Sequence, residues 1–104
     1  MRRAKVFVNG IEAGILSEIK QNAEYIFEYN DGYDGPEVSR TMLPSKAKYI
    51  YSMFPPFFEG LLPEGVQLEG LLKLNKIDRD DLFSQLISVG NEVVGAVTVK
   101  EITE

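Results

Sequence analysis

The sequence of 104 residues contains no cysteine and no histidine. Without cysteine the chain has no disulfide, no thiolate nucleophile and no zinc–thiolate site. Without histidine it lacks the commonest general base and the commonest transition-metal ligand of proteins. Serines are present, but no histidine can activate them as in a catalytic triad. We therefore predict that the chain is not an enzyme and that it has no catalytic residue, no cofactor and no metal site.

Long apolar runs and excess positive charge are also missing. No apolar stretch approaches the roughly 20 residues needed to span a bilayer. The start, Met1–Lys5, lacks the apolar run and cleavage site of a signal peptide. Lysine and arginine number 11 against 16 acidic residues, a net charge of −5, which opposes binding to a phosphate backbone. We expect a cytoplasmic protein that contacts neither membrane nor nucleic acid directly.

What the chain does contain is typical of a globular protein. Hydrophobic residues make up 44% and charged residues 26%, and the length suits one domain over residues 1–104.

The first third predicts a three-stranded meander. Strands are expected at Lys5–Val8, Ile11–Ile19 and Glu24–Tyr29, with Asn9-Gly10 between the first two as a hairpin signal. In the second strand, Ile11, Ile15, Leu16 and Ile19 are the apolar members, and Gly14 indicates a bulge or a close backbone approach. In the third, Tyr25, Phe27 and Tyr29 alternate onto one face.

The middle of the chain predicts a loop and two short extended pieces. Residues 30–36 have loop composition. Val38–Met42 and Tyr49–Tyr51 read as extended, and each is followed by proline within a few residues. Asp31 and Asp34 resemble calcium ligands only superficially, because their spacing and the missing closing glutamate do not fit a calcium loop.

The last part predicts helices and a final strand. A short helix is expected within residues 55–62 and a second over Val66–Leu74, with Leu68, Leu71 and Leu72 on one face. A third is expected to begin at Asp78 as its cap, with Asp80 and Asp81 favouring the helix dipole and Leu82, Phe83, Leu86 and Ile87 as its buried stripe. Gly90 is expected to end it in the left-handed conformation. Residues 93–99 predict a strand that is buried on both faces and joins the N-terminal sheet.

The order of these elements predicts an α+β fold. We expect a small antiparallel sheet, formed by the N-terminal meander and joined by the C-terminal strand, with two or three short helices between.

One segment stands out as a candidate site. Residues 53–65, MFPPFFEGLLPEG, place three phenylalanines and two leucines among prolines and glycines. One interpretation is that Phe57, Phe58 and Leu61 fill the core. The other is that the turn from Leu62 to Val66 projects outward as a stiff tip that inserts into a partner, since rigid tips lose little entropy on docking.

The same segment carries a family resemblance. Residues 57–65 resemble the FFxxLLPEG signature of the N-terminal subdomain of HipA-type kinases. Residues 6–16 resemble its opening hairpin, Asp81–Leu86 followed by Gly90 its helix, and Gly95–Val97 its closing strand. All four occur in the family's order and together span nearly the whole chain.

The resemblance implies a binding role. In full-length toxin kinases the ATP-binding and catalytic residues lie beyond this subdomain, so no kinase activity follows for this chain. The likeness instead implies a stand-alone HipS-like antitoxin of a three-gene HipBST system, which binds a HipT-like toxin kinase while a HipB-like protein brings the DNA-binding function. The docking face would include the FFxxLLPEG segment and the next residue: Phe57, Phe58, Leu61, Leu62, Pro63, Glu64, Gly65 and Val66.

Other interpretations remain open. The chain could be a truncated N-terminal subdomain of a full-length HipA-type toxin, with a scaffolding role. A small co-regulator that binds operator DNA itself is opposed by the acidic composition. A hydrolase that relies on carboxylates alone is the weakest option, because helix capping already explains the acids at residues 78–81.

Overall fold

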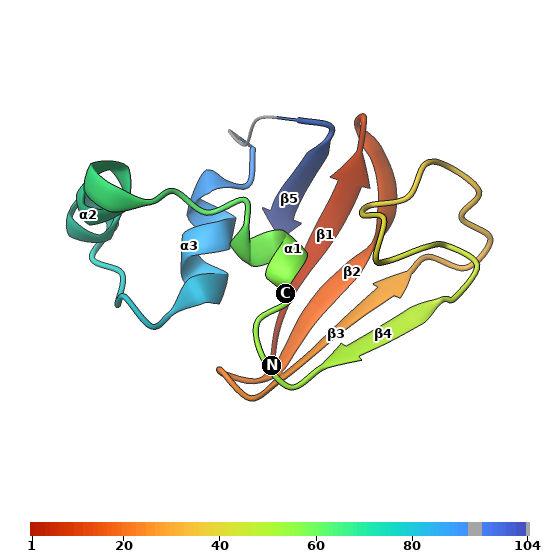
Figure 1. Cartoon of the computed structure of the whole chain (residues 1–104), viewed down its shortest axis with the longest axis horizontal. Coiled ribbons are helices and arrows are strands. Elements are labelled where there is room, and N and C mark those ends of the chain that lie inside the picture. Colours follow the sequence, from red (N-terminus) through yellow and green to blue (C-terminus); the bar gives the residue numbers. More distant parts are fainter. Residues whose placement is uncertain (92–94, 104) are drawn as a thin grey trace.

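The computed structural model describes residues 1–91 and 95–103 and confirms the expected α+β fold (Figure 1). The described residues form one five-stranded antiparallel sheet in the order β4-β3-β2-β1-β5, with the helices between β4 and β5 in the chain. The strands are β1 (Arg2–Val8), β2 (Ile11–Lys20), β3 (Glu24–Tyr29), β4 (Lys48–Tyr51) and β5 (Val97–Glu101). The helices are α1 (Pro56–Glu59), α2 (Gly65–Asn75) and α3 (Leu82–Val89).

The β1–β2 hairpin has the turn and the bulge that its sequence predicts. Asn9 and Gly10 have φ angles of 51° and 81°, as a type I′ turn requires. The register then shifts, because Val6 pairs with Gly14 while Phe7 pairs with Glu12. A Cβ on Gly14 would lie 2.4 Å from the Glu28 carbonyl oxygen on β3. Gly14 therefore serves both the bulge and a close backbone approach.

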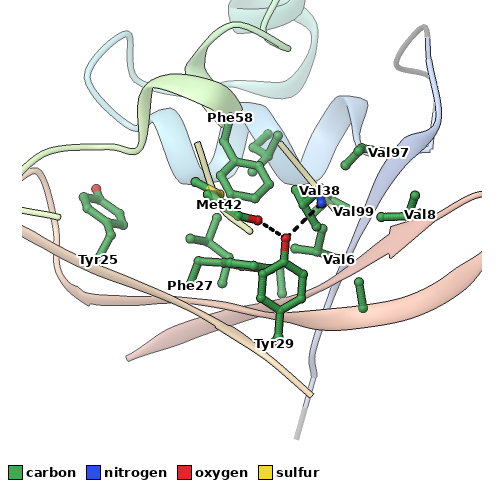
Figure 2. Packing of buried hydrophobic residues seen from close by; sticks show 14 of the residues in the cluster. Val6, Val8, Tyr25, Phe27, Tyr29, Val38, Met42, Phe58, Val97 and Val99 are labelled. Atoms are coloured by element: carbon green, nitrogen blue, oxygen red, sulfur yellow. Dashed lines mark hydrogen bonds between the residues drawn. The ribbon is translucent and has the colours of Figure 1, made fainter. Parts of the chain in front are cut away.

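The core lies between one face of the sheet and helices α1 and α3. Tyr25, Phe27 and Tyr29 all point into it, as their alternation predicts, and Phe58 of α1 packs 6.0 Å from Phe27 between ring centroids (Figure 2). Each fully buried side chain of this size contributes about 2–3 kcal/mol of transfer free energy. On β2, only Leu16 of the four apolar residues named from the sequence is buried. β2 thus contributes Ala13 and Leu16 to the core, beside the buried residues of β1, β3 and β5.

Residues 38–42 do not form the extended piece expected from the sequence. They form a turn closed by an isolated bridge between Ser39 and Met42. The Tyr29 hydroxyl accepts a hydrogen bond from the Val38 amide at 2.9 Å and donates one to the Met42 carbonyl (Figure 2). Because one phenol holds both ends of the segment, the backbone folds back instead of extending. Burial raises the pKa of this Tyr29 hydroxyl, so it stays protonated and able to donate.

The C-terminal strand joins the sheet as expected, but it begins later. β5 pairs with β1 from Val97 onward, while Gly95 and Ala96 form a bend. Val93 and Val94 lie outside the described residues, so their expected strand structure and burial are not addressed.

The expected left-handed end of α3 is wrong, because Gly90 has a φ of −54°. The glycine is needed for another reason. A Cβ at this position would lie 2.1 Å from the Val99 carbonyl oxygen, and the Val99 amide donates to the Gly90 carbonyl at 3.0 Å. The close approach docks the end of α3 against β5.

The N-terminal cap of α3 is Asp81, which corrects the expectation of Asp78. The Asp81 carboxylate accepts from the Ser84 amide at 3.1 Å. Residues 78–81 instead form a turn in which the Asp81 amide donates to the Asp78 carbonyl at 3.0 Å. The buried Gln85 side chain also donates to the backbone of this turn, at the carbonyl of Arg79. The turn occupies the residues that would have formed a first helical turn.

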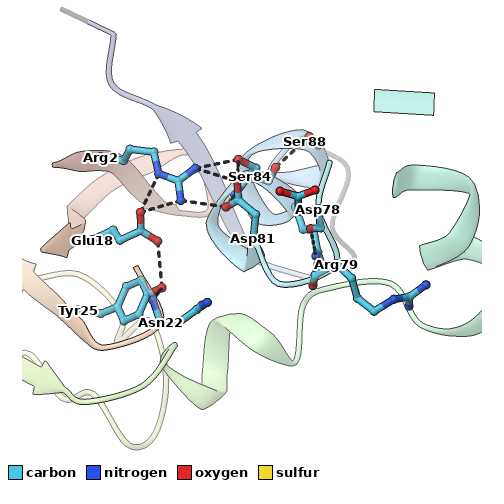
Figure 3. Close-up of polar contacts among 10 residues, drawn as sticks. Arg2, Glu18, Asn22, Tyr25, Asp78, Arg79, Asp81, Ser84 and Ser88 are labelled. Carbon is cyan, nitrogen blue, oxygen red and sulfur yellow. Dashed lines mark hydrogen bonds and ion pairs between the residues drawn. The ribbon is translucent and has the colours of Figure 1, made fainter. Parts of the chain in front are cut away.

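A polar cluster ties the N-terminus of the chain to this helix (Figure 3). Arg2 donates from Nε to the buried Glu18 at 2.7 Å and from Nη2 to Asp81 at 2.9 Å. The Tyr25 hydroxyl donates to the other oxygen of Glu18 at 2.9 Å. Arg2 also lies over the Phe83 ring, 5.0 Å from its centroid. The cluster fixes α3 against β1 and β2, and α3 in turn carries α2.

Candidate docking surface

The segment singled out from the sequence begins with a short helix that prolines set in place. Pro55 is the N-cap of α1 and Pro56 its first residue, where the missing N–H costs no hydrogen bond. Two aromatic residues follow. Phe58 is fully buried, whereas Phe57 is half-buried and meets Phe58 edge-on at 5.2 Å between ring centroids. The core interpretation is therefore confirmed for Phe58 in full and for Phe57 in part.

After α1 the residues become gradually more exposed along the chain. Leu61 and Leu62 are half-buried and pack against the core, and Pro63 is half-buried as well. Glu64 and Gly65 are exposed. The expected outward turn is thus present only in its second half, and its contribution to partner binding stays a prediction.

The tip of the turn leads directly into α2. Gly65 has a φ of +60°, a conformation that L-residues seldom adopt, and no atom lies within 4 Å of where its Cβ would be. Val66 follows with 88% of its surface exposed. The tip therefore turns through a left-handed glycine and ends in an uncovered apolar side chain.

Helix α2 is apolar on two sides, and only one of them is covered. Leu68, Leu71 and Leu72 share the expected face, of which Leu72 is buried. Val66 and Leu74 lie on the opposite side, given 3.6 residues per turn, and Leu74 is 85% exposed.

Gly70 lies between Val66 and Leu74 on this exposed side, and a Cβ there would meet no atom within 4 Å. Glycine inside a helix costs about 1 kcal/mol relative to alanine, and no contact among the described residues requires it here. We call Val66, Gly70 and Leu74 the α2 stripe.

Sequence reasoning did not single out Gly70 or Leu74. The sequence indicates Leu74 only as the last residue of a helix, and it shows no motif at Gly70. The available signal was two apolar residues eight apart, Val66 and Leu74, outside the face set by Leu68, Leu71 and Leu72. Because Leu68, Leu71 and Leu72 already account for one buried helix face, the pattern alone does not indicate a second apolar side.

Helix α2 projects from the rest of the molecule, at the end of the long axis opposite to β4 (Figure 1). Its main contact with another element is with α3. An exposed ion pair between Arg79 and Glu69 adds a link to the turn before α3, but exposed pairs contribute only about 0–1 kcal/mol. The α2 stripe therefore lies away from the sheet, on a helix that has few contacts with the rest of the described chain.

The described residues form neither a metal-binding cluster nor a membrane-spanning helix. In residues 1–91 and 95–103, no three histidine, cysteine, aspartate or glutamate side chains gather so as to hold a metal ion. Within the same ranges no helix has both the length and the apolar character needed to cross a bilayer. Fold and surface together define a small antiparallel α+β domain with a projecting, partly uncovered apolar helix.

Comparison with known proteins places this domain in a family. The family model described as HipA N-terminal domain matches residues 4–100. The chain therefore belongs to the HipA N-terminal domain family, as its FFxxLLPEG segment indicates. A solved structure, described as the N-terminal domain of HipA toxin, superposes with a TM-score of 0.77 at 27% sequence identity, covering 100% of this chain and 95% of that one.

A relative of similar size is found in Haemophilus influenzae (strain ATCC 51907 / DSM 11121 / KW20 / Rd). This protein, described only as an uncharacterized protein, is 30% identical over 101 residues. The matched region covers 97% of this chain and 93% of the relative. The relative thus consists of little beyond this one domain.

Proposed function

We propose that this chain acts as a HipS-like antitoxin, which binds a HipA/HipT-type serine/threonine toxin kinase and obstructs its active site. It acts by binding and performs no catalysis. Two findings support the proposal. The family to which the chain belongs is a non-catalytic part of the toxin, and the Haemophilus influenzae relative shows the domain in a protein of almost the same extent.

The uncovered α2 stripe is the observation that carries the proposal. Helix α2 has apolar residues on two sides, and on the side away from Leu72 the side chains of Val66 and Leu74 are 88% and 85% exposed. Exposed apolar surface that gathers in one place marks a protein interaction site. Gly70 between them would let a partner helix or strand approach the α2 backbone closely, which explains a glycine that no contact among residues 1–91 and 95–103 requires.

The tip before α2 supplies the obstructing element. Pro63 restricts the backbone of the tip, and its position directly before the first turn of α2 limits how far it can move, which reduces the conformational entropy lost on docking. A kinase requires precise placement of the loops around its phosphate-transfer site. A small rigid wedge that includes Leu62 and Val66 is enough to disturb that placement.

The proposal includes the wider assembly. A HipB-like DNA-binding protein joins the kinase and this chain in a ternary complex, and the acidic chain itself does not touch DNA. The complex resides in the cytoplasm, where a kinase has ATP.

Variants of the tip and stripe test the proposal. Val66→Asp and Leu74→Asp place a charge where the partner must be apolar, and both side chains are exposed, so folding is not disturbed. Leu62→Asp tests the base of the tip, with circular dichroism to verify its fold. Ile11→Asp is the matched control, because Ile11 is 58% exposed on the β1–β2 hairpin, away from α2.

The readout is phosphorylation of substrate by the purified HipT-like kinase at rising concentrations of each variant. We expect inhibition by Val66→Asp to weaken at least tenfold, as burial of one unpaired charge costs more than about 1.4 kcal/mol. Ile11→Asp should inhibit like the unmodified chain. Full inhibition by folded Leu62→Asp and Val66→Asp would rule out the tip.

A further inference from the structure

The outer edge of β4 is open for pairing with another strand. The Tyr29 amide donates to the Ala47 carbonyl at 2.8 Å. Since hydrogen-bonded pairs alternate along an antiparallel ladder, Tyr49 and Tyr51 direct their backbone groups at β3. Lys48 and Ile50 then direct theirs away from the sheet, where no strand of the described chain pairs with them. The other edge differs, because Gly90 accepts a hydrogen bond from Val99 on β5.

A groove with aromatic walls runs beside this open edge. Its volume is about 360 Å³, and Tyr49, Tyr51 and Phe57 form much of its lining. Lys46 stands at the groove with its Nζ atom 5.2 Å from the centroid of the Tyr49 ring. Tyr49 and Tyr51 pair with Phe27 and Tyr25, so the groove lies on the core side of the sheet. A strand added to β4 would direct every second side chain into the groove.

The charged residue among those that line the groove is Lys46, and the chain segment around it is basic although the net charge of the chain is −5. Residues 38–51 contain Arg40, Lys46 and Lys48 and no acidic residue, although the chain carries 16 acids and a net charge of −5. All three basic side chains belong to exposed residues. The nearest acids by sequence and register are Glu37, which precedes the segment, and Glu28, which pairs with Lys48. The edge therefore favours an acidic partner.

We propose that β4 and its groove bind an extended peptide segment of a partner protein, in which acidic residues alternate with apolar ones. The peptide adds a sixth strand, its backbone bonding to Lys48 and Ile50 and its apolar side chains filling the aromatic groove. Its alternate, acidic side chains point to the opposite face of the sheet, the face from which Lys48 projects. A second copy of this chain is a poorer occupant, because two edges bearing Lys46 and Lys48 would repel each other. This site is separate from the α2 stripe, so the two surfaces can bind different partners.

Hydrogen exchange on the full chain tests the site. The probe is an acetylated nonapeptide in which glutamate alternates with valine and phenylalanine, and NMR follows the amides of Lys48 and Ile50. At a peptide concentration ten times its Kd, exchange at both amides should slow about tenfold. A peptide with lysine in place of glutamate, and one N-methylated at alternate residues, should have no such effect.

Substitutions at the edge separate backbone pairing from side-chain contact. Ile50→Pro removes the outward amide and leaves the bonds to β3 intact, so it should abolish the slowing at Lys48. Ile50→Thr keeps that amide and should bind the peptide like the original chain. Lys48→Gln, at an exposed side chain, keeps the fold and should weaken binding about fivefold.

Three results would overturn the proposal. One is unchanged exchange at Lys48 and Ile50 with millimolar peptide. Another is binding of the lysine peptide with the same Kd as the glutamate peptide, which would show that charge does not contribute to binding. The third is slowing that grows with protein concentration in the absence of peptide, which would show that a second copy occupies the edge.

Discussion

Arg2 and Asp81 are separated by 79 residues, yet their side chains form an ion pair of 2.9 Å. The same guanidinium binds Glu18, so one residue at the start of β1 holds the cap of α3 and an acid of β2 together. The position of α3, and with it the projection of α2, depends on this contact.

Loss of the Arg2 side-chain charge should destabilise the protein. Arg2→Met leaves buried Glu18 and capping Asp81 without their cation, and an unpaired buried carboxylate is costly. We expect the free energy of unfolding to fall by about 2–4 kcal/mol in urea titrations. Lys100→Met, at an exposed position on β5, is the control and should change stability by less than about 0.5 kcal/mol. Equal effects of the two substitutions would show that the cluster contributes nothing.

The cap of α3 gives a second prediction. Asp81→Ala removes the acceptor for the Ser84 amide and should cost about 1–2 kcal/mol. Asp78→Ala should be nearly neutral, because Asp78 takes part in the turn through its backbone carbonyl. Thermal unfolding of both variants measures the difference. The reverse order would restore the sequence-based assignment of the cap.

Low pH should weaken the contacts of the Asp81 carboxylate with Arg2 and Ser84. Burial would raise the pKa of the Asp81 carboxyl, but hydrogen bonds from Arg2 and Ser84 outweigh it and hold that pKa below its ordinary value of 3.8. The unfolded state therefore binds this proton more tightly than the folded state. The stability that ionised Asp81 contributes is present above about pH 4 and is lost as the pH falls through its folded pKa.

The acid effect can be isolated with one substitution. Urea midpoints measured from about pH 5 down to about pH 2.5 should fall less steeply for Asp81→Asn than for the original chain. Parallel curves for the two proteins would assign the acid sensitivity to other carboxylates.

Two glycines should respond in opposite ways to alanine. Gly14→Ala places a Cβ 2.4 Å from the Glu28 carbonyl oxygen, and backbone atoms cannot yield easily, so we expect a loss of about 1–3 kcal/mol or more. Gly70→Ala meets open space in α2 and should stabilise the free chain by about 1 kcal/mol.

The proposed interface predicts a second effect of the substitution Gly70→Ala, on binding. If a partner packs closely on the α2 stripe, Gly70→Ala should weaken kinase binding while it stabilises the free chain. Isothermal titration with the HipT-like kinase measures that affinity. Stabilisation with unchanged affinity would show that the partner does not approach the α2 backbone at Gly70.

Much of the fold could be predicted from the sequence, since its local signals were strong. The Asn9-Gly10 turn, the alternation of Tyr25, Phe27 and Tyr29, and the proline start of α1 all depend on neighbouring residues only. The errors arose where distant contacts decide the conformation. The cap of α3 is Asp81 and not the predicted Asp78, because a turn occupies residues 78–81. Gly90 has a right-handed conformation because the backbone of Val99 lies against it.

The candidate site was predictable in part for the same reason. The prolines and glycines of residues 53–66 indicate from the sequence that Phe58 belongs to the core and that Val66 belongs to an outward turn. The exposed side of α2 at Leu74 and the open strand edge at Ile50 could not be predicted from the sequence, because the exposure of a residue depends on which neighbours the fold provides. The Arg2–Asp81 pair required the sheet register to be known.

The most direct measurement mixes the purified chain with the HipT-like kinase and follows both complex formation and phosphorylation of its substrate. Light scattering after size exclusion should show one copy of this chain bound to one kinase, with phosphorylation falling as the complex forms. A kinase that stays free and fully active at concentrations well above those in the cell would contradict the account.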